Sequence, residues 1–269
     1  MRAFYLPDEG GFLRWLEIPG ADPPIIWLHG IWCSSTGELA TAAVQPALRG
    51  RRSLLVDLFG YGYSDRPEAF GYAVEDHARS VVALVDGLGI ERCVLFGHSM
   101  GGTIATLVAA ARPGVVATLI VAEANLDGGP GLISGGIAAE DEAAFVAGGF
   151  AARLAEQRAA ARERGELPAA HVGITALVSA RALHRAAASL VRGCDPPARD
   201  RLRGLSMPRY YLNGERSAES ALPPQPDLVA AGVEWRTVPQ AGHPMALENP
   251  AGLAEIIAEL IADAGSRTA

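Results

Sequence analysis

Six short β-branched or apolar runs, separated by stretches with helical periodicity, limit the folds open to this chain more than any other feature. Runs such as IIWL at 25–28 and CVLF at 93–96 are apolar throughout rather than alternating, which is typical of strands covered on both faces. Stretches with apolar residues three and four positions apart predict the helices that cover them. The sequence therefore predicts an α/β fold with a doubly wound, mostly parallel sheet. The predicted strands are 25–28, 53–58, 93–96, 118–122, 209–212 and 233–238, and the predicted helices between them include 74–88, 100–111 and 253–264.

The character of the sequence changes between positions 125 and 194. A glycine-rich stretch, LDGGPGLISGG, leads into segments rich in Ala, Arg and Glu at about 139–164 and 169–192. These segments have helical composition, and nothing in them repeats at a fixed period. The sequence thus predicts a core made of 1–124 and 195–269, interrupted by a helical lid at 125–194.

Composition excludes several kinds of function. The 269 residues include 23 basic and 30 acidic side chains, for a net charge of −7, and every basic residue is arginine. Without lysine there can be no Schiff base, no pyridoxal-phosphate chemistry and no Walker-A phosphate loop. A net negative charge also argues against a nucleic-acid partner, which would require a basic surface.

The cysteines and the apolar segments predict neither a metal site nor a membrane partner. Cys33, Cys93 and Cys194 form no CxxC pair and have no histidine at zinc-ligand spacing, so we expect reduced thiols. The first ten residues carry two acids where a secretory signal needs an apolar stretch. The apolar region at 103–122 is interrupted by Arg112-Pro113, so neither half could span a bilayer. We therefore expect a cytoplasmic protein.

The sharpest motif is GHSMGG at 97–102, which directly follows one predicted strand and directly precedes a predicted helix. It contains G-x-S-x-G in the context that this motif requires. Its glycines permit a tight strand-to-helix turn, from which the Ser99 hydroxyl would project beside the positive end of the helix. We therefore identify Ser99 as a candidate nucleophile.

With three further motifs in order, the chain resembles the α/β-hydrolase superfamily over nearly its whole length. His29-Gly30 closes a predicted strand, as the HG turn does in that family, and 57–67 matches its D-x-x-G-x-G-x-S-x-x-P segment. The motif containing Ser99 comes next, and His243 lies after the last predicted strand, where the family places its catalytic histidine. The resemblance implies an α/β-hydrolase fold with a helical lid insertion.

The resemblance also implies roles for particular residues. His243 would act as the base that takes the Ser99 proton. Two backbone N–H groups, those of Met100 and Ile31, would form the oxyanion hole. Trp32 would line the acyl pocket or simply pack. The remaining histidines are expected to be structural, with His29 in its turn, His98 packed beside the nucleophile, and His77, His171 and His184 in helical patterns.

The acid of the triad departs from the common family pattern. That pattern places an Asp three residues past Gly214, but Ser217 occupies this position and only Glu215 and Glu219 flank it. Glu123 follows the earlier predicted strand 118–122, at a strand end where a subset of the haloalkane dehalogenases carry their acid. We expect Glu123 to be the acid, with Glu215 and Glu219 as alternatives.

A serine nucleophile with a histidine base implies acyl chemistry through a Ser-His-Glu triad and an acyl-enzyme intermediate. We expect a carboxylic-ester hydrolase acting on a small-molecule ester, thioester or lactone, with no metal or organic cofactor. Haloalkane dehalogenases and epoxide hydrolases of this fold use an Asp nucleophile, and are disfavoured. Acyltransferases, cyclases, C–C bond hydrolases and non-catalytic ligand binders of the same fold remain alternatives, and the sequence predicts no oligomeric state.

Overall fold

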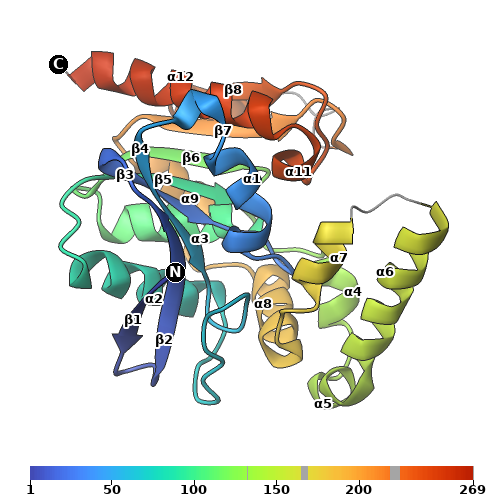
Figure 1. The fold of residues 1–269 in the computed structure, drawn as a ribbon. Helices are drawn as coiled ribbons and strands as arrows, with labels where there is room; N and C mark the ends of the chain where they lie inside the picture. Colours follow the sequence, from blue (N-terminus) through green and yellow to red (C-terminus); the bar gives the residue numbers. More distant parts are fainter. Residues whose placement is uncertain (132, 165–168, 219–224, 269) are drawn as a thin grey trace.

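The computed structural model describes residues 1–131, 133–164, 169–218 and 225–268. Within these ranges eight strands form one sheet in the order β1-β2-β4-β3-β5-β6-β7-β8 (Figure 1). Strands β3 to β8 run parallel, whereas β1 and β2 pair antiparallel with each other and β2 pairs antiparallel with β4. The strands are β1 Arg2–Leu6, β2 Gly11–Ile18, β3 Ala21–Leu28, β4 Arg51–Asp57, β5 Cys93–His98, β6 Val116–Ala122, β7 Arg209–Gly214 and β8 Val233–Val238.

All six strands predicted from apolar runs are present, which confirms the mostly parallel α/β architecture. The two N-terminal strands were not predicted. In β2 the burial alternates, with Leu13 and Trp15 inside and Phe12 exposed, as expected for an antiparallel strand with one buried face. Strand β2 therefore contains no continuous apolar run, and of the short run AFYL in β1 only Leu6 is buried.

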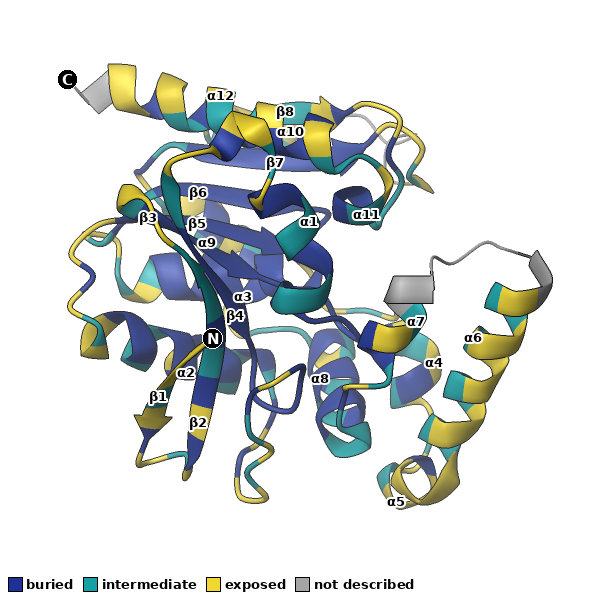
Figure 2. Ribbon diagram, in the orientation of Figure 1, coloured by how far each residue is buried: buried dark blue, intermediate teal, exposed yellow. Residues whose placement is uncertain are grey.

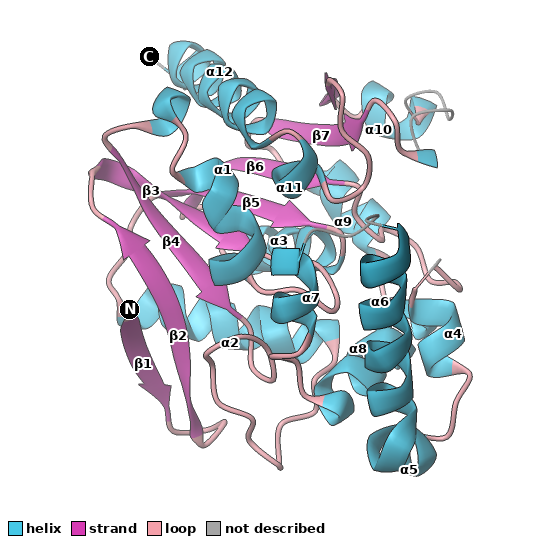
Figure 3. Cartoon of the chain, turned by 45° about the vertical axis from the view of Figure 1, so that its right-hand side comes forward, coloured by secondary structure: helices cyan, strands magenta, loops and turns pink. Residues whose placement is uncertain are grey.

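Helices cover both faces of the sheet (Figures 1 and 3). Ile26 and Leu28 of β3 belong to the apolar cluster that includes residues of α2 and α3, whereas Ile25 and Trp27 belong to the cluster that includes residues of α12. Successive side chains of one strand thus supply two cores, which is the reason the run is apolar throughout. The helices of the first layer are α2 Val74–Gly87, α3 Met100–Ala111, α9 Ala198–Gly204 and α10 Pro226–Ala230; those of the second are η1 Ser35–Leu39, α1 Ala40–Ala43, η2 Pro46–Leu48, α11 Met245–Glu248 and α12 Pro250–Thr268.

The segment between β6 and α9 is largely helical, as its composition predicts. Helix α8 Ala180–Arg192 buries Leu183 and Leu190 in the core, whereas α6 Phe150–Arg164 lies away from the sheet and is exposed over much of its length (Figure 2). That this segment acts as a lid stays a prediction. Its other helices are α4 Ser134–Ala138, α5 Glu142–Ala144, η3 Phe145–Gly149 and α7 Ala169–Thr175.

Across the described ranges, no helix combines the length and apolar character needed to cross a membrane.

Candidate active site

Ser99 lies on a strained turn between β5 and α3. Its backbone has φ 53° and ψ −122°, a conformation that non-glycine residues rarely adopt. Its N–H donates to the carbonyl of Ala122 at 2.8 Å, which fixes the turn against the end of β6. A Cβ at Gly101 would lie 2.2 Å from the Leu28 carbonyl oxygen, so only glycine permits this close approach of α3 to β3. Gly101 thus permits the tight strand-to-helix turn that the sequence predicts.

Glu123 and His243 meet at the carboxyl ends of the parallel strands. Glu123 directly follows β6, and its Oε2 lies 2.5 Å from Nδ1 of His243, which lies in the segment after β8. The other oxygen, Oε1, accepts the backbone N–H of Gly214 at 2.8 Å. Glu123 is only 1% exposed, so these contacts supply the partners that a buried carboxylate requires.

These contacts keep the Glu123 carboxylate ionised. Burial alone would raise its pKa, but hydrogen bonds from His243, from the Gly214 N–H and from the Ser217 hydroxyl lower the pKa below its usual value. Because an ionised carboxylate only accepts hydrogen bonds, Nδ1 of His243 carries a proton. The neutral ring therefore has its lone pair on Nε2, where it can accept a proton.

Ser99, Glu123 and His243 line one pocket of about 450 Å³. Part of its wall comes from the strand ends, and part comes from the predicted lid segment through Ile133 and Leu190. Its exposed wall is more apolar than polar, which suits the organic part of a small ligand. The sequence did not single out these lid residues, because no local pattern reports which of them reach the strand ends.

The two expected oxyanion-hole residues flank Ser99. Met100 follows it as the first residue of α3, and Ile31 lines the same pocket. A Cβ at Gly30 would lie 3.1 Å from the Ser99 Cβ, so the turn that precedes Ile31 lies directly against the candidate nucleophile.

Trp32 does not line this pocket. Its buried ring lies 6.1 Å from the ring of Phe150 at the start of α6. The structure thus places Trp32 in packing between the core and the predicted lid, which is the alternative role that the sequence left open.

Of the two alternative acids, the structure describes only Glu215. Glu215 accepts the backbone N–H of Gln240 at 2.6 Å through its Oε2. Glu219 lies outside the described residues. Ser217, at the usual acid position, instead bonds to Glu123 and thereby supports the carboxylate at the earlier strand end. The sequence missed this role of Ser217, which only the spatial approach of β6 and β7 reveals.

Two buried polar side chains, those of His98 and Glu38, lie next to His243 in the structure. The rings of His98 and His243 have centroids 4.7 Å apart, and Nδ1 of His98 lies 3.6 Å from Oε1 of the buried Glu38. Burial lowers the pKa of His98 to about 3, with the nearby charge of His243 acting in the same direction. His98 is therefore a neutral ring that packs beside the candidate base, as the sequence led us to expect.

His29 links its own HG turn to the segment 57–67, which are two of the motifs that resemble the family. Its Nδ1 donates to the carbonyl of Gly30 at 2.8 Å, because its Nε2 accepts the N–H of Leu58 at 3.1 Å. The adjacent Asp57 accepts a backbone N–H from Thr36 at 3.0 Å. His29 thus fixes the turn beside Ser99 through backbone contacts, and its position is structural.

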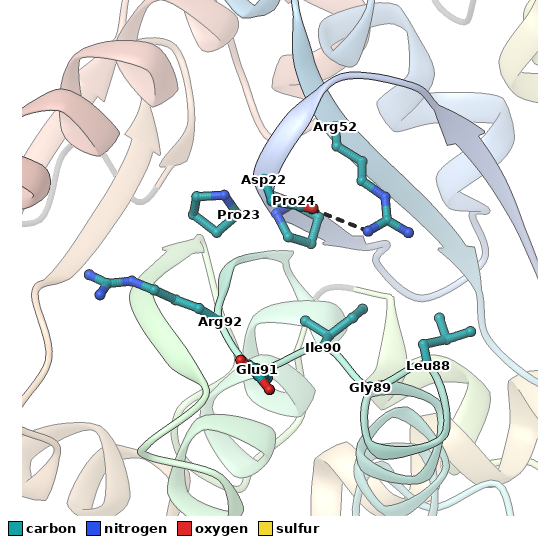
Figure 4. Close-up of a pocket in the computed structure, with 9 residues that line it drawn as sticks. All are labelled: Asp22, Pro23, Pro24, Arg52, Leu88, Gly89, Ile90, Glu91 and Arg92. Carbon is teal, nitrogen blue, oxygen red and sulfur yellow. Dashed lines mark hydrogen bonds and ion pairs between the residues drawn. The ribbon is translucent and has the colours of Figure 1, made fainter.

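A second hollow of about 410 Å³ lies at the opposite, amino ends of the strands (Figure 4). It is lined by the start of β3, by Arg52 of β4 and by the loop 88–92 before β5. Arg52 is engaged there with Asp22 at 3.2 Å and with Glu17 at 2.9 Å. Ligands of open α/β sheets bind outside the carboxyl ends of the strands, so Ser99 marks the better candidate site.

Among the described residues, no group of three or more His, Cys, Asp or Glu side chains could hold a metal ion. Cys33 and Cys93 are buried and Cys194 is half-buried, and all three are free thiols, as expected.

Comparison with known proteins bears on the fold. The family described as alpha/beta hydrolase fold matches residues 23–190. The haloalkane dehalogenase 2 of Mycobacterium bovis is 38% identical over 94 residues, which are 35% of this chain and 32% of the relative. The sn-1-specific diacylglycerol lipase of Mus musculus is 42% identical over 103 residues, or 38% of this chain and 32% of the relative. The chain thus spans about a third of the length of these curated relatives.

The fold extends beyond these matched segments. The solved structure of a thermophilic esterase from Thermogutta terrifontis superimposes with a TM-score of 0.76 over 94% of both chains, at 21% sequence identity. At that identity the likeness establishes the fold, including the regions outside 23–190.

Proposed function

Because the chain belongs to the α/β-hydrolase family, we propose that it is a serine hydrolase that cleaves carboxylic esters, thioesters or lactones through an acyl-enzyme. The observation that carries this proposal is the contact of Glu123 with His243 at 2.5 Å, in the pocket that contains Ser99. A buried, ionised carboxylate against one ring nitrogen leaves the other nitrogen available as a base.

In the proposed first step, Nε2 of His243 takes the Ser99 proton while the serine oxygen attacks the acyl carbon. A new bond forms between Oγ and that carbon, and the carbonyl electron pair moves to oxygen. The backbone N–H groups of Met100 and Ile31 would stabilise this oxyanion. The imidazolium that forms is stabilised by Glu123 and then donates its proton to the departing alcohol or thiol.

In the second step, water replaces the leaving group. His243 takes a proton from water as the water attacks the acyl-enzyme, and it returns this proton to Ser99 when the carboxylic acid departs. For a lactone, the alcohol stays attached to the acyl chain and the ring opens. A small-molecule substrate suits a pocket of about 450 Å³.

The serine at position 99 favours this chemistry over dehalogenation. A carboxylate that displaces a halide forms an ester, which water can then cleave. Ser99 attacking the same saturated carbon would form an ether, and the enzyme would be trapped. The likeness to a dehalogenase over 94 residues therefore does not extend to its reaction in our proposal.

Turnover of a simple ester tests the proposal. We expect the purified protein to hydrolyse p-nitrophenyl butyrate, with a fall in kcat of about a thousandfold or more in Ser99→Ala and in His243→Asn. The matched control is Ser53→Ala, which should retain full activity, because Ser53 is a buried serine of β4 that does not line the pocket. Full activity in Ser99→Ala would overturn the proposal.

A further inference from the structure

We propose that Arg216 makes this pocket select substrates that carry a carboxylate in addition to the acyl group that is cleaved. The inference rests on the proposed function, because it concerns the pocket that contains Ser99. It goes further by naming a chemical class of substrate, namely half-esters of dicarboxylic acids and related anionic acyl compounds.

The loop after β7 forms part of the pocket wall. Its backbone is held by the Arg216 N–H, which donates to the carbonyl of Ala241 at 2.8 Å. Arg216, Ser217 and Ala218 all line the pocket. In this loop the Ser217 hydroxyl bonds to Glu123, whereas Arg216 is exposed and lines the pocket.

The charges of the pocket favour an anion at this wall. Glu123 is the one carboxylate among the described lining residues, and its two oxygens already bond to His243 and Gly214. Among the described lining residues, Arg216 is the one side chain with a permanent positive charge. No ion pair between described residues involves Arg216. Other arginines, such as Arg14 and Arg199, do have carboxylate partners.

A guanidinium suits this task because its planar fork of N–H groups matches the two oxygens of a carboxylate. The exposed Arg216 side chain is long, so it can reach a ligand without a change in the backbone. The apolar lining of Ile31, Ile133 and Leu190 would hold the hydrocarbon chain between the two ends. A short dicarboxylic half-ester would then place one end at Ser99 and the other at Arg216.

Paired substrates that differ in one charge test this inference. Monomethyl glutarate and dimethyl glutarate share a chain and a scissile ester, and only the first carries a carboxylate at pH 7.5. We expect Arg216→Ala to lower the ratio of kcat/KM for the charged over the neutral ester by about tenfold, mainly through KM. Arg216→Lys should retain part of the ratio, and Arg216→Glu should lower it further.

The matched control is Arg203→Ala, which removes the same charge from α9, away from the pocket. It should leave the ratio as in the wild type. An unchanged ratio in Arg216→Ala would overturn the inference, as would an equal fall in Arg203→Ala.

Binding separates this inference from the proposed function. Monomethyl glutarate can be titrated by calorimetry into Ser99→Ala and into the double variant Ser99→Ala/Arg216→Ala. Binding to the first that is weakened about tenfold or more in the second supports the inference even if no ester is cleaved. Equal affinities, or no binding to either, would contradict the role of Arg216, whatever the outcome of the turnover experiments.

Discussion

Glu123 combines three properties that rarely occur in one residue. It is 1% exposed, its φ is 45°, and its carboxylate has a pKa below the usual value. A positive φ in a non-glycine residue and a buried charge both cost free energy. Contacts with His243, Gly214 and Ser217 offset that cost, which is why we assign the residue a role in the reaction.

Replacing this carboxylate by an amide gives the first prediction. We expect Glu123→Gln to lower kcat by about a thousandfold, because the amide stabilises the imidazolium poorly and permits the wrong tautomer of His243. The chain should still fold, since the glutamine oxygen can accept the Gly214 N–H. Steady-state ester hydrolysis and circular dichroism check the two parts.

Glu215→Gln is the control, because the Glu215 carboxylate accepts the backbone N–H of Gln240 and takes no part in the proposed reaction. It should retain kcat within about threefold, because a group that takes no part in the reaction should act independently of it. A larger loss in Glu215→Gln than in Glu123→Gln would move the acid to the loop after β7.

Among the elements, the turn from β5 to α3 leaves no room for a side chain at its second glycine. A Cβ at Gly101 would lie 2.2 Å from the Leu28 oxygen and 2.6 Å from the His29 oxygen, and both are backbone atoms that cannot swing away. We expect Gly101→Ala to lower the free energy of unfolding by about 3 kcal/mol. Urea denaturation measures this change.

Gly114 offers the matched comparison, because a Cβ there would meet nothing within 4 Å. Gly114→Ala should change the free energy of unfolding by less than about 0.5 kcal/mol. Equal stability of Gly101→Ala and the wild type would show that the turn can relax, and would remove the steric reason for the second glycine of G-x-S-x-G.

The strands and helices also show how much of the fold the sequence could predict. Strands β3, β5 and β6 lie inside the sheet and are covered on both faces, so each contains a continuous apolar run that can be recognised locally. The edge strand β8, VEWRTV, has no such run and was predicted from its β-branched residues. Strands β1 and β2 bury one face only, and Phe12 and Tyr5 are exposed apolar residues that blur even the alternation. Helix α3 was predicted at its observed bounds because a motif begins it and Arg112-Pro113 follow its end.

The candidate site could be predicted only in part, because a sequence shows local motifs but not contacts between distant segments. Ser99 and His243 lie in motifs, and Glu123 stands out as an acid directly after a buried strand. Ser217 and Arg216 carry no such signal, because their contacts depend on how β6, β7 and the segment 125–194 come together in space. The roles assigned to all these residues stay predictions until they are tested.

For the whole molecule, the buried His77 contributes to how stability depends on pH. His77 of α2 is fully buried among Tyr61, Phe70 and Tyr72, and burial lowers its pKa to about 3, with a smaller contribution from His29. Between pH 6.5 and 3 the unfolded chain therefore binds a proton that the native protein does not. Stability is complete above this window and falls as the pH falls through it.

We expect His77 to account for a loss of about 2 kcal/mol in the free energy of unfolding between pH 7.5 and pH 5. In His77→Phe this loss should be smaller by that amount, because the phenyl ring fills the site and cannot titrate. Urea denaturation at both pH values measures the difference. The same pH dependence in both proteins would contradict a neutral, buried His77.

The central claim is that Ser99 is an activated nucleophile, and a fluorophosphonate probe tests it without knowledge of the substrate. Intact mass and peptide mapping should show one label on the wild type, located at Ser99, none on Ser99→Ala, and slow labelling of His243→Asn. A folded wild-type protein that takes no label, or takes it at another serine, would contradict the account.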